Sequence, residues 1–127
     1  MNSATSNADM DELYDQVPAD FPRPGILSSL AGAHPKLALV QYNGKFYSPG
    51  CTPPEVWARW DICEDLAKHL ADRCRETEKG KYAHLSRAEI LSQYYERSLR
   101  TGWGSDEEMR WISHRTAQLV GWPALDI

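Results

Sequence analysis

The chain has 127 residues, which is enough for one small domain and too few for the two lobes of a kinase. Hydrophobic residues make up 42% of the chain, including five Trp and six Tyr, so it has enough apolar surface for a core and is not a disordered chain. Its formal net charge of −4 argues against a surface that binds nucleic acid through the phosphates.

The N-terminal part is expected to be an arm ahead of a single small domain. Residues 1–10 are small and polar, which is typical of a disordered terminus. The segment 11–17 predicts a short acidic helix, and the three prolines that follow it favour an extended backbone. We therefore assign residues 11–127 to one domain.

A β-hairpin is predicted at about 36–48. Its two strands, at 36–42 and 45–47, flank the pair Asn43-Gly44, which suits the two positive-φ positions of a type I′ turn. Because an isolated hairpin is marginally stable in water, we expect it to pack on the helices or to gain a further strand. Its free strand edges would also permit a homodimer.

Three helices are predicted next, each opened by the same capping pattern. A hydroxyl residue with Glu three positions later occurs at Thr52, Ser86 and Ser105, and this pair satisfies two otherwise unpaired backbone amides. Glycine follows each helical stretch, at positions 80, 102 and 121, and readily adopts the left-handed conformation that ends a helix. These signals predict helices at about 53–79, 86–101 and 105–120.

Apolar stripes on the three helices predict that they pack together. In the first helix the stripe comprises Val56, Trp60, Cys63, Ala67, Leu70 and Cys74, widened by Ile62 and Leu66. The other two contribute Ile90, Leu91, Tyr94, Tyr95 and Leu99, and Met109, Ile112, Thr116, Leu119 and Val120. Trp103 and Trp122 are expected to fold back over helix ends. The predicted fold class is α+β, an N-terminal hairpin packed on a three-helix bundle.

The segment ahead of the hairpin carries the pattern S-x-A-G-A-x-x-K, from Ser29 to Lys36. Backbone amides around Gly32 and the Lys36 ammonium group have the chemistry of a phosphate-binding loop, and Ser28 or Ser29 offers a hydroxyl. Residues 28–49 resemble the glycine-rich, ATP-facing loop and following hairpin of the HipA-like serine/threonine kinase toxins. The resemblance implies a nucleotide or phosphate site at these four residues, and Ser29 matches the autophosphorylated loop serine.

The sequence argues against catalysis. Pro35 removes one amide from the loop, and we find no catalytic-loop Asp with the downstream metal ligand of a kinase. An alternative interpretation is that Gly32 only leads the chain tightly into the first strand. The four His residues are scattered, and none belongs to a recognisable Ser–His or Cys–His site. We predict a protein that is not an enzyme and has no cofactor.

The first helix carries an acidic face. Asp61, Asp65, His69 and Asp72 follow one another at steps of four, four and three, which places them on one side of the helix. A divalent cation site and a solvated surface both fit this pattern, and we favour the solvated surface. Together with Trp57, the three Asp residues are candidates for binding a basic protein partner.

Basic residues on the last two helices suggest a helix-turn-helix as a further possibility. They comprise Arg97, Arg100, Arg110, His114 and Arg115. The last helix, however, opens with three consecutive carboxylates, which would repel DNA and are better explained by the helix dipole. DNA binding is therefore the weakest of the candidate functions.

The three cysteines, Cys51, Cys63 and Cys74, are odd in number and lack C-x-x-C spacing. This pattern does not indicate a disulfide framework. The sequence also shows no charged-then-apolar leader, so export is not expected. We expect a cytoplasmic protein with buried thiols.

The function that fits these features is a small binding or regulatory protein that acts through a protein partner. Immunity proteins, antitoxins and accessory factors of bacterial conflict systems are of this kind. The alternative is a nucleotide- or phosphate-binding module related to the front part of a HipA-like kinase.

Overall fold

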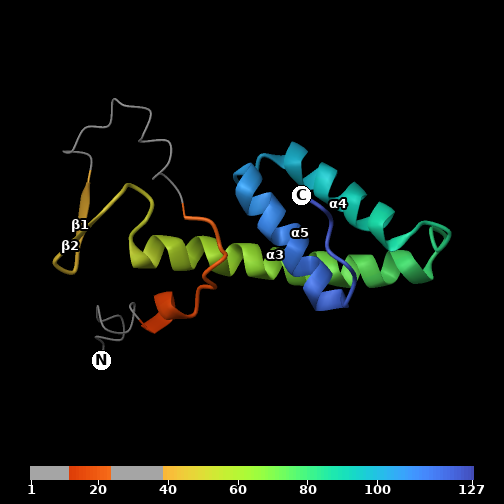
Figure 1. Ribbon diagram of the computed structural model, residues 1–127, viewed down its shortest axis with the longest axis horizontal. Helices are drawn as coiled ribbons and strands as arrows, with labels where there is room; N and C mark the ends of the chain where they lie inside the picture. The colour runs from red at the N-terminus through yellow and green to blue at the C-terminus, as the bar shows by residue number, and fades with distance from the viewer. Residues whose placement is uncertain (1–11, 24–38) are drawn as a thin grey trace. The chain divides into compact units, whose positions relative to one another are not determined.

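The computed structural model describes residues 12–23 and 39–127 (Figure 1). Its elements are β1 (Val40–Tyr42), β2 (Lys45–Tyr47), α3 (Pro53–Lys79), α4 (Arg87–Thr101) and α5 (Asp106–Val120). A short helical segment at residues 12–15 falls within the predicted acidic helix. The α+β class is confirmed, with this segment in addition to the three predicted long helices. The predicted disordered arm at 1–10 lies outside the described residues.

The chain divides into two compact units, residues 1–61 and 62–127, and the division falls inside α3. The first unit contains the hairpin and the start of α3, and the second contains the rest of α3 with α4 and α5. The packing of the hairpin on the helices stays a prediction. So does the single domain over 11–127.

The hairpin of the first unit has the predicted turn. Asn43 and Gly44 have φ values of 52° and 78°, as a type I′ turn requires. The strands pair antiparallel with Val40 opposite Tyr47. The first strand is shorter than predicted within the described residues, because Leu39 lies outside β1 and residues 36–38 are not described.

Two of the three predicted capping boxes are complete. At the start of α4, the Glu89 amide donates to the Ser86 hydroxyl over 3.0 Å, and the Ser86 amide donates to the Glu89 carboxylate over 2.8 Å. Ser105 and Glu108 make the same reciprocal pair at the start of α5. These local bonds explain why the helix starts were predictable from a four-residue pattern.

The ends of α3 differ from the prediction in detail. At Thr52 the amide donates to the Glu55 carboxylate over 3.3 Å, but the hydroxyl also bonds that carboxylate, so the charged acceptor takes both donors. At the other end Gly80 has no positive φ, so the left-handed stop predicted there is wrong. The Gly80 amide instead donates to the Thr77 carbonyl over 3.3 Å, which closes a tight turn.

The other two glycine stops are confirmed. Gly102 and Gly121 have φ values of 72° and 75°. Beyond Gly121, the Trp122 amide donates to the Ala117 carbonyl over 2.9 Å, which satisfies one of the last helical acceptors. Trp122 is buried as predicted, and the Arg87 guanidinium lies 5.3 Å from the centroid of its ring.

The core of the second unit lies between α3, α4 and α5. The predicted stripe residues that are buried there are Cys63, Ala67, Cys74, Ile90, Leu91, Met109, Ile112 and Thr116. Three residues outside the predicted stripes are also buried, Ala71, Trp111 and Ala117. The Thr116 hydroxyl donates to the Ile112 carbonyl over 2.7 Å, so a polar residue is accommodated in this core.

Three apolar residues predicted to be buried are exposed instead. Ile62 is 55% exposed, Leu99 37% and Trp103 57%. Ile62 and Leu99 lie at the margins of their stripes, where the helix surface already turns toward solvent. Trp103, unlike Trp122, is more than half exposed, directly after the end of α4.

A partly buried ion pair that the sequence analysis missed joins α3 to α5. The Arg115 guanidinium contacts both carboxylate oxygens of Glu64, at 2.8 and 2.9 Å. The side chain of Glu64 is only 11% exposed and that of Arg115 is 34% exposed. Because the contact is bidentate and shielded from water, it is stronger than an ordinary surface pair.

We predict that Glu64→Gln lowers the free energy of unfolding by about 1 to 3 kcal/mol, because the guanidinium loses its charged acceptor. Urea denaturation followed by circular dichroism measures the change. Glu96→Gln, at an exposed position within α4, is the control and should change stability by less than about 0.5 kcal/mol. If the two substitutions lower the free energy of unfolding equally, the ion pair between Glu64 and Arg115 does not contribute to stability.

Candidate interaction site

A groove of about 370 Å³ lies between α3 and α4 in the second unit. It is lined by Leu66, His69, Leu70 and Arg73 from α3, by Tyr94, Arg97, Ser98 and Thr101 from α4, and by Trp103. Each helix contributes residues at i, i+3, i+4 and i+7, which is one face over two turns. Each wall is therefore roughly 10 Å long.

Short side chains on α4 keep this groove open. The Ser98 hydroxyl donates to the Tyr95 carbonyl and the Thr101 hydroxyl donates to the Ser98 carbonyl, both over 2.7 Å. Both hydroxyls are thus bound to their own helix and do not extend toward α3. The space opposite Leu66 and Leu70 stays unfilled.

The charged side chains of the groove are all basic. Arg73 comes from α3, Arg97 comes from α4, and no carboxylate is among the lining residues. The whole chain, by contrast, has 18 acidic residues against 14 Lys and Arg. Arg73 has an ion pair with Glu76 at 4.0 Å, but both side chains are more than half exposed, so the pair is weak.

Two aromatic side chains complete the groove. The Tyr94 hydroxyl is hydrogen-bonded to the Thr77 hydroxyl at 2.9 Å, which fixes the ring against α3. The Arg97 guanidinium lies 5.5 Å from the centroid of that ring. Trp103 follows directly after the Gly102 cap, and the left-handed turn leaves its indole 57% exposed.

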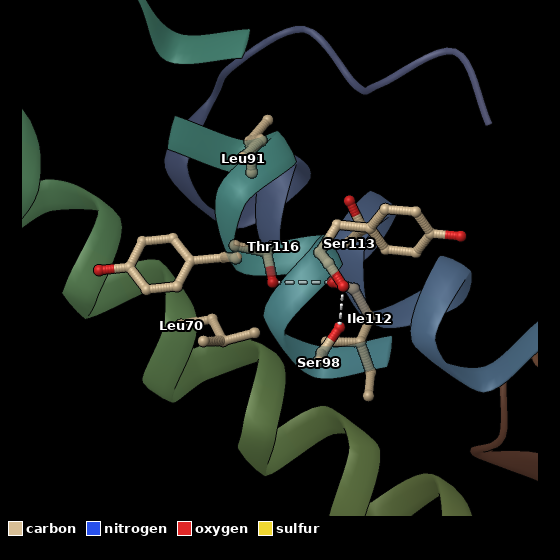
Figure 2. A pocket seen from close by; sticks show the side chains of 8 residues that line it. Leu70, Leu91, Ser98, Ile112, Ser113 and Thr116 are labelled. Atoms are coloured by element: carbon tan, nitrogen blue, oxygen red, sulfur yellow. Dashed lines mark hydrogen bonds between the residues drawn. The ribbon is translucent and has the colours of Figure 1, made fainter. Parts of the chain in front are cut away.

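A small cavity of about 10 Å³ shares lining residues with the groove, and Figure 2 shows the side chains that surround this cavity. Leu70, Tyr94 and Ser98 line both spaces, so their side chains form the wall between them. On the inner side, the buried Ser113 hydroxyl has no hydrogen-bond partner in the described part of the chain. The cavity has about the volume that one water molecule needs.

The residues of the predicted acidic face all belong to α3, with Asp61 in the first unit and Asp65 and Asp72 in the second. Asp65 and Asp72 are exposed and Asp61 is half-buried. Asp72 accepts a hydrogen bond from Arg75 at 3.0 Å, so part of its charge is compensated. Trp57 is half-buried, and its ring meets the Trp60 ring edge-on at 6.5 Å. The described residues hold no group of three His, Cys, Asp or Glu side chains arranged to bind a metal ion.

The predicted phosphate-binding residues, Ser28, Ser29, Gly32 and Lys36, lie outside the described residues. Of residues 28–49, the structure describes 39–49, and the turn of the hairpin there has the conformation given above.

Two members of the basic strip predicted for the last two helices lie in different surroundings. Arg115 is neutralised by Glu64, and Arg97 lies in the groove against Tyr94. From the sequence, Arg97 was grouped with the basic residues of the last two helices and His69 with the acidic face of the first helix, so the groove was not predicted. The shared i, i+3, i+4, i+7 spacing of the two walls is the signal that would have identified them.

The three cysteines are buried, as predicted for Cys63 and Cys74. Burial raises the pKa of the Cys74 thiol to about 11, and it also raises the pKa of Cys51 above its ordinary value. Both thiols are therefore protonated at neutral pH, when the thiolate is the reactive form. Neither is suited to nucleophilic catalysis.

Comparison with known protein families, curated proteins and solved structures finds no match. In the described ranges, none of the helices is both long and apolar enough to cross a membrane.

We predict that Cys74 makes stability fall as the pH rises from about 9 to about 11. The ordinary pKa of this thiol is 9.0, and in the folded protein it is raised to about 11. Between these two values the folded protein keeps a proton that the unfolded chain has lost, so the free energy of unfolding is unaffected below about pH 9 and falls up to about pH 11. Urea unfolding at pH 8, 9, 10 and 11 should show a shallower decline for Cys74→Ala. Parallel declines in the two proteins would contradict the pKa assigned to this thiol.

Proposed function

We propose that this chain is a non-catalytic binding protein that acts through a protein partner, and that the groove between α3 and α4 is its docking surface. One observation carries the proposal. An exposed Trp103, the ring of Tyr94 and the guanidinium groups of Arg73 and Arg97 line a single concave surface. Trp, Tyr and Arg are the residue types that dominate the binding energy of protein interfaces.

The shape of the groove supports docking of a protein segment. Each of its two walls is formed by two turns of a helix, and the α3 wall includes the apolar side chains of Leu66 and Leu70. A surface of this kind receives the apolar face of a helix from a partner. Its charged rim would select and orient the partner.

The acidic face of α3, with Asp61, Asp65, Asp72 and Trp57, is proposed as a second surface, suited to a basic partner. A homodimer through the edges of the hairpin stays a further proposal. The buried thiols favour a reducing compartment, which supports a cytoplasmic location. Within this proposal, an immunity, antitoxin or accessory role in a bacterial conflict system is the narrower assignment, based on small size and acidity.

The alternative function is a nucleotide- or phosphate-binding module related to the front part of a HipA-like kinase. It depends on Gly32 and Lys36 and on the resemblance of residues 28–49. It predicts that Mg-ATP raises the melting temperature of the protein and that Lys36→Ala removes this rise. A melting temperature that Mg-ATP leaves unchanged would reject the alternative.

We predict that Trp103→Ala weakens binding of the natural partner by at least about tenfold, because an interface Trp commonly contributes more than 1 kcal/mol. The partner is captured from the native cell on the immobilised protein, identified by mass spectrometry and titrated by calorimetry. Tyr82→Ala is the matched control, since Tyr82 is 48% exposed and lies outside the groove. A partner that binds both variants like the unmodified protein would rule out the groove as the docking surface.

A further inference from the structure

We infer that the occupant of the groove is an acidic amphipathic helix of the partner protein. This inference rests on the proposed function and specifies the chemistry of the partner. Its apolar side chains would cover Leu66, Leu70 and Trp103, and its carboxylates would face Arg73 and Arg97.

The charge of the groove requires an acidic occupant. Both walls contribute cations, with Arg73 on α3 and Arg97 on α4, and the lining has no carboxylate to neutralise them. A basic or purely apolar segment would cover these guanidinium groups, leaving Arg97 without a charged acceptor and Arg73 with only its weak pair to Glu76, which costs binding energy. Carboxylates placed along both edges of the occupant would pair with them from each side.

The backbone of the walls requires an occupant that satisfies its own hydrogen bonds. An extended peptide gains affinity by pairing its backbone with the edge of a sheet. The groove is walled by α3 and α4, whose backbone groups are already bonded within each helix. A helix brings no unpaired backbone groups along its length, so it fits this surface.

The apolar residues match the repeat of a helix. Two turns of an occupant place anchors at i, i+3 or i+4, and i+7 over roughly 10 Å, which is the length of each wall. Ile62 lies one turn before Leu66 on α3 and is 55% exposed. It extends the apolar surface by another turn, so a partner helix of about three turns would be in contact along its whole length.

Neighbouring charges disfavour a nucleic acid in this place. Asp65 and Asp72 are exposed on α3, directly beside Leu66 and Arg73 in the sequence. A nucleic acid that covered more of α3 than the groove would come near these carboxylates, whereas a short helix confined to the groove contacts only its lining residues.

The experiment is a selection of randomised 16-residue peptides, displayed on phage, against the immobilised full-length protein. The enriched peptides are synthesised with a fluorescent label, and their affinities are measured by fluorescence anisotropy. We expect sequences with apolar residues at i and i+4 or i+7, flanked by Asp or Glu. Their affinity should fall at least tenfold between 50 and 500 mM salt.

The decisive comparison uses charge-reversed variants. Arg73→Glu and Arg97→Glu should each weaken binding at least tenfold, while Arg100→Glu should change it less than threefold. Arg100 is exposed on α4 outside the groove and is the matched control. A peptide with Lys in place of its Glu residues should bind the double variant Arg73→Glu/Arg97→Glu more tightly than the original peptide does. Circular dichroism verifies that each variant is folded.

The other outcomes separate the inference from the proposed function. Enriched peptides that are basic or uncharged, or that bind Arg73→Glu and Arg97→Glu normally, overturn the acidic helix. If their binding is still lost in Trp103→Ala, the groove remains the docking surface. Peptides whose affinity is the same for Arg73→Glu, Arg97→Glu, Trp103→Ala and the unmodified protein overturn both the acidic helix and the groove as docking surface. A selection that enriches no peptide also overturns the acidic helix, and capture of the natural partner then decides the function by itself.

Discussion

Close approach to α3 is the constraint on which the second unit depends. The buried face of this helix carries small side chains, Cys63, Ala67, Ala71 and Cys74. At the middle of this face, the Thr116 hydroxyl of α5 lies within 3.4 Å of the Ala67 carbonyl oxygen, a contact that a larger side chain would obstruct. Small residues at such a seam let helix backbones approach until the larger residues of the neighbouring helices fill the core.

The same packing separates the charges of this acidic protein. On the side where α3 meets α5, the guanidinium of Arg115 forms a bidentate ion pair with the carboxylate of Glu64. On the side where α3 meets α4, Arg73 and Arg97 line a groove that contains no carboxylate. A chain with a net charge of −4 therefore has a local basic surface, and that surface coincides with an exposed Trp103. The coincidence of charge and apolar surface underlies the proposed docking of a partner.

Features that depend on a few neighbouring residues followed from the sequence. The hairpin turn and the starts of α4 and α5 are each fixed by bonds or φ values within four residues, and they have the predicted form. Even local rules failed where a competing contact was available. Gly80 closes a tight turn onto Thr77, and the Thr52 hydroxyl bonds the Glu55 carboxylate. The Gly80 amide thus uses the Thr77 carbonyl as its acceptor without a left-handed turn, and the Thr52 hydroxyl donates to Glu55 when the capping rule expects it to accept from the backbone.

The sequence by itself determined the α+β class, the bounds of the three long helices to within one residue and most of the buried stripe, because capping and periodicity are encoded within single segments. Only the tertiary structure decided which side of each stripe faces solvent, which arginine is neutralised and which is not, and where α3 and α4 leave a groove. These outcomes depend on the rotation and spacing of one helix against another. That geometry results from side-chain packing between segments distant in the sequence.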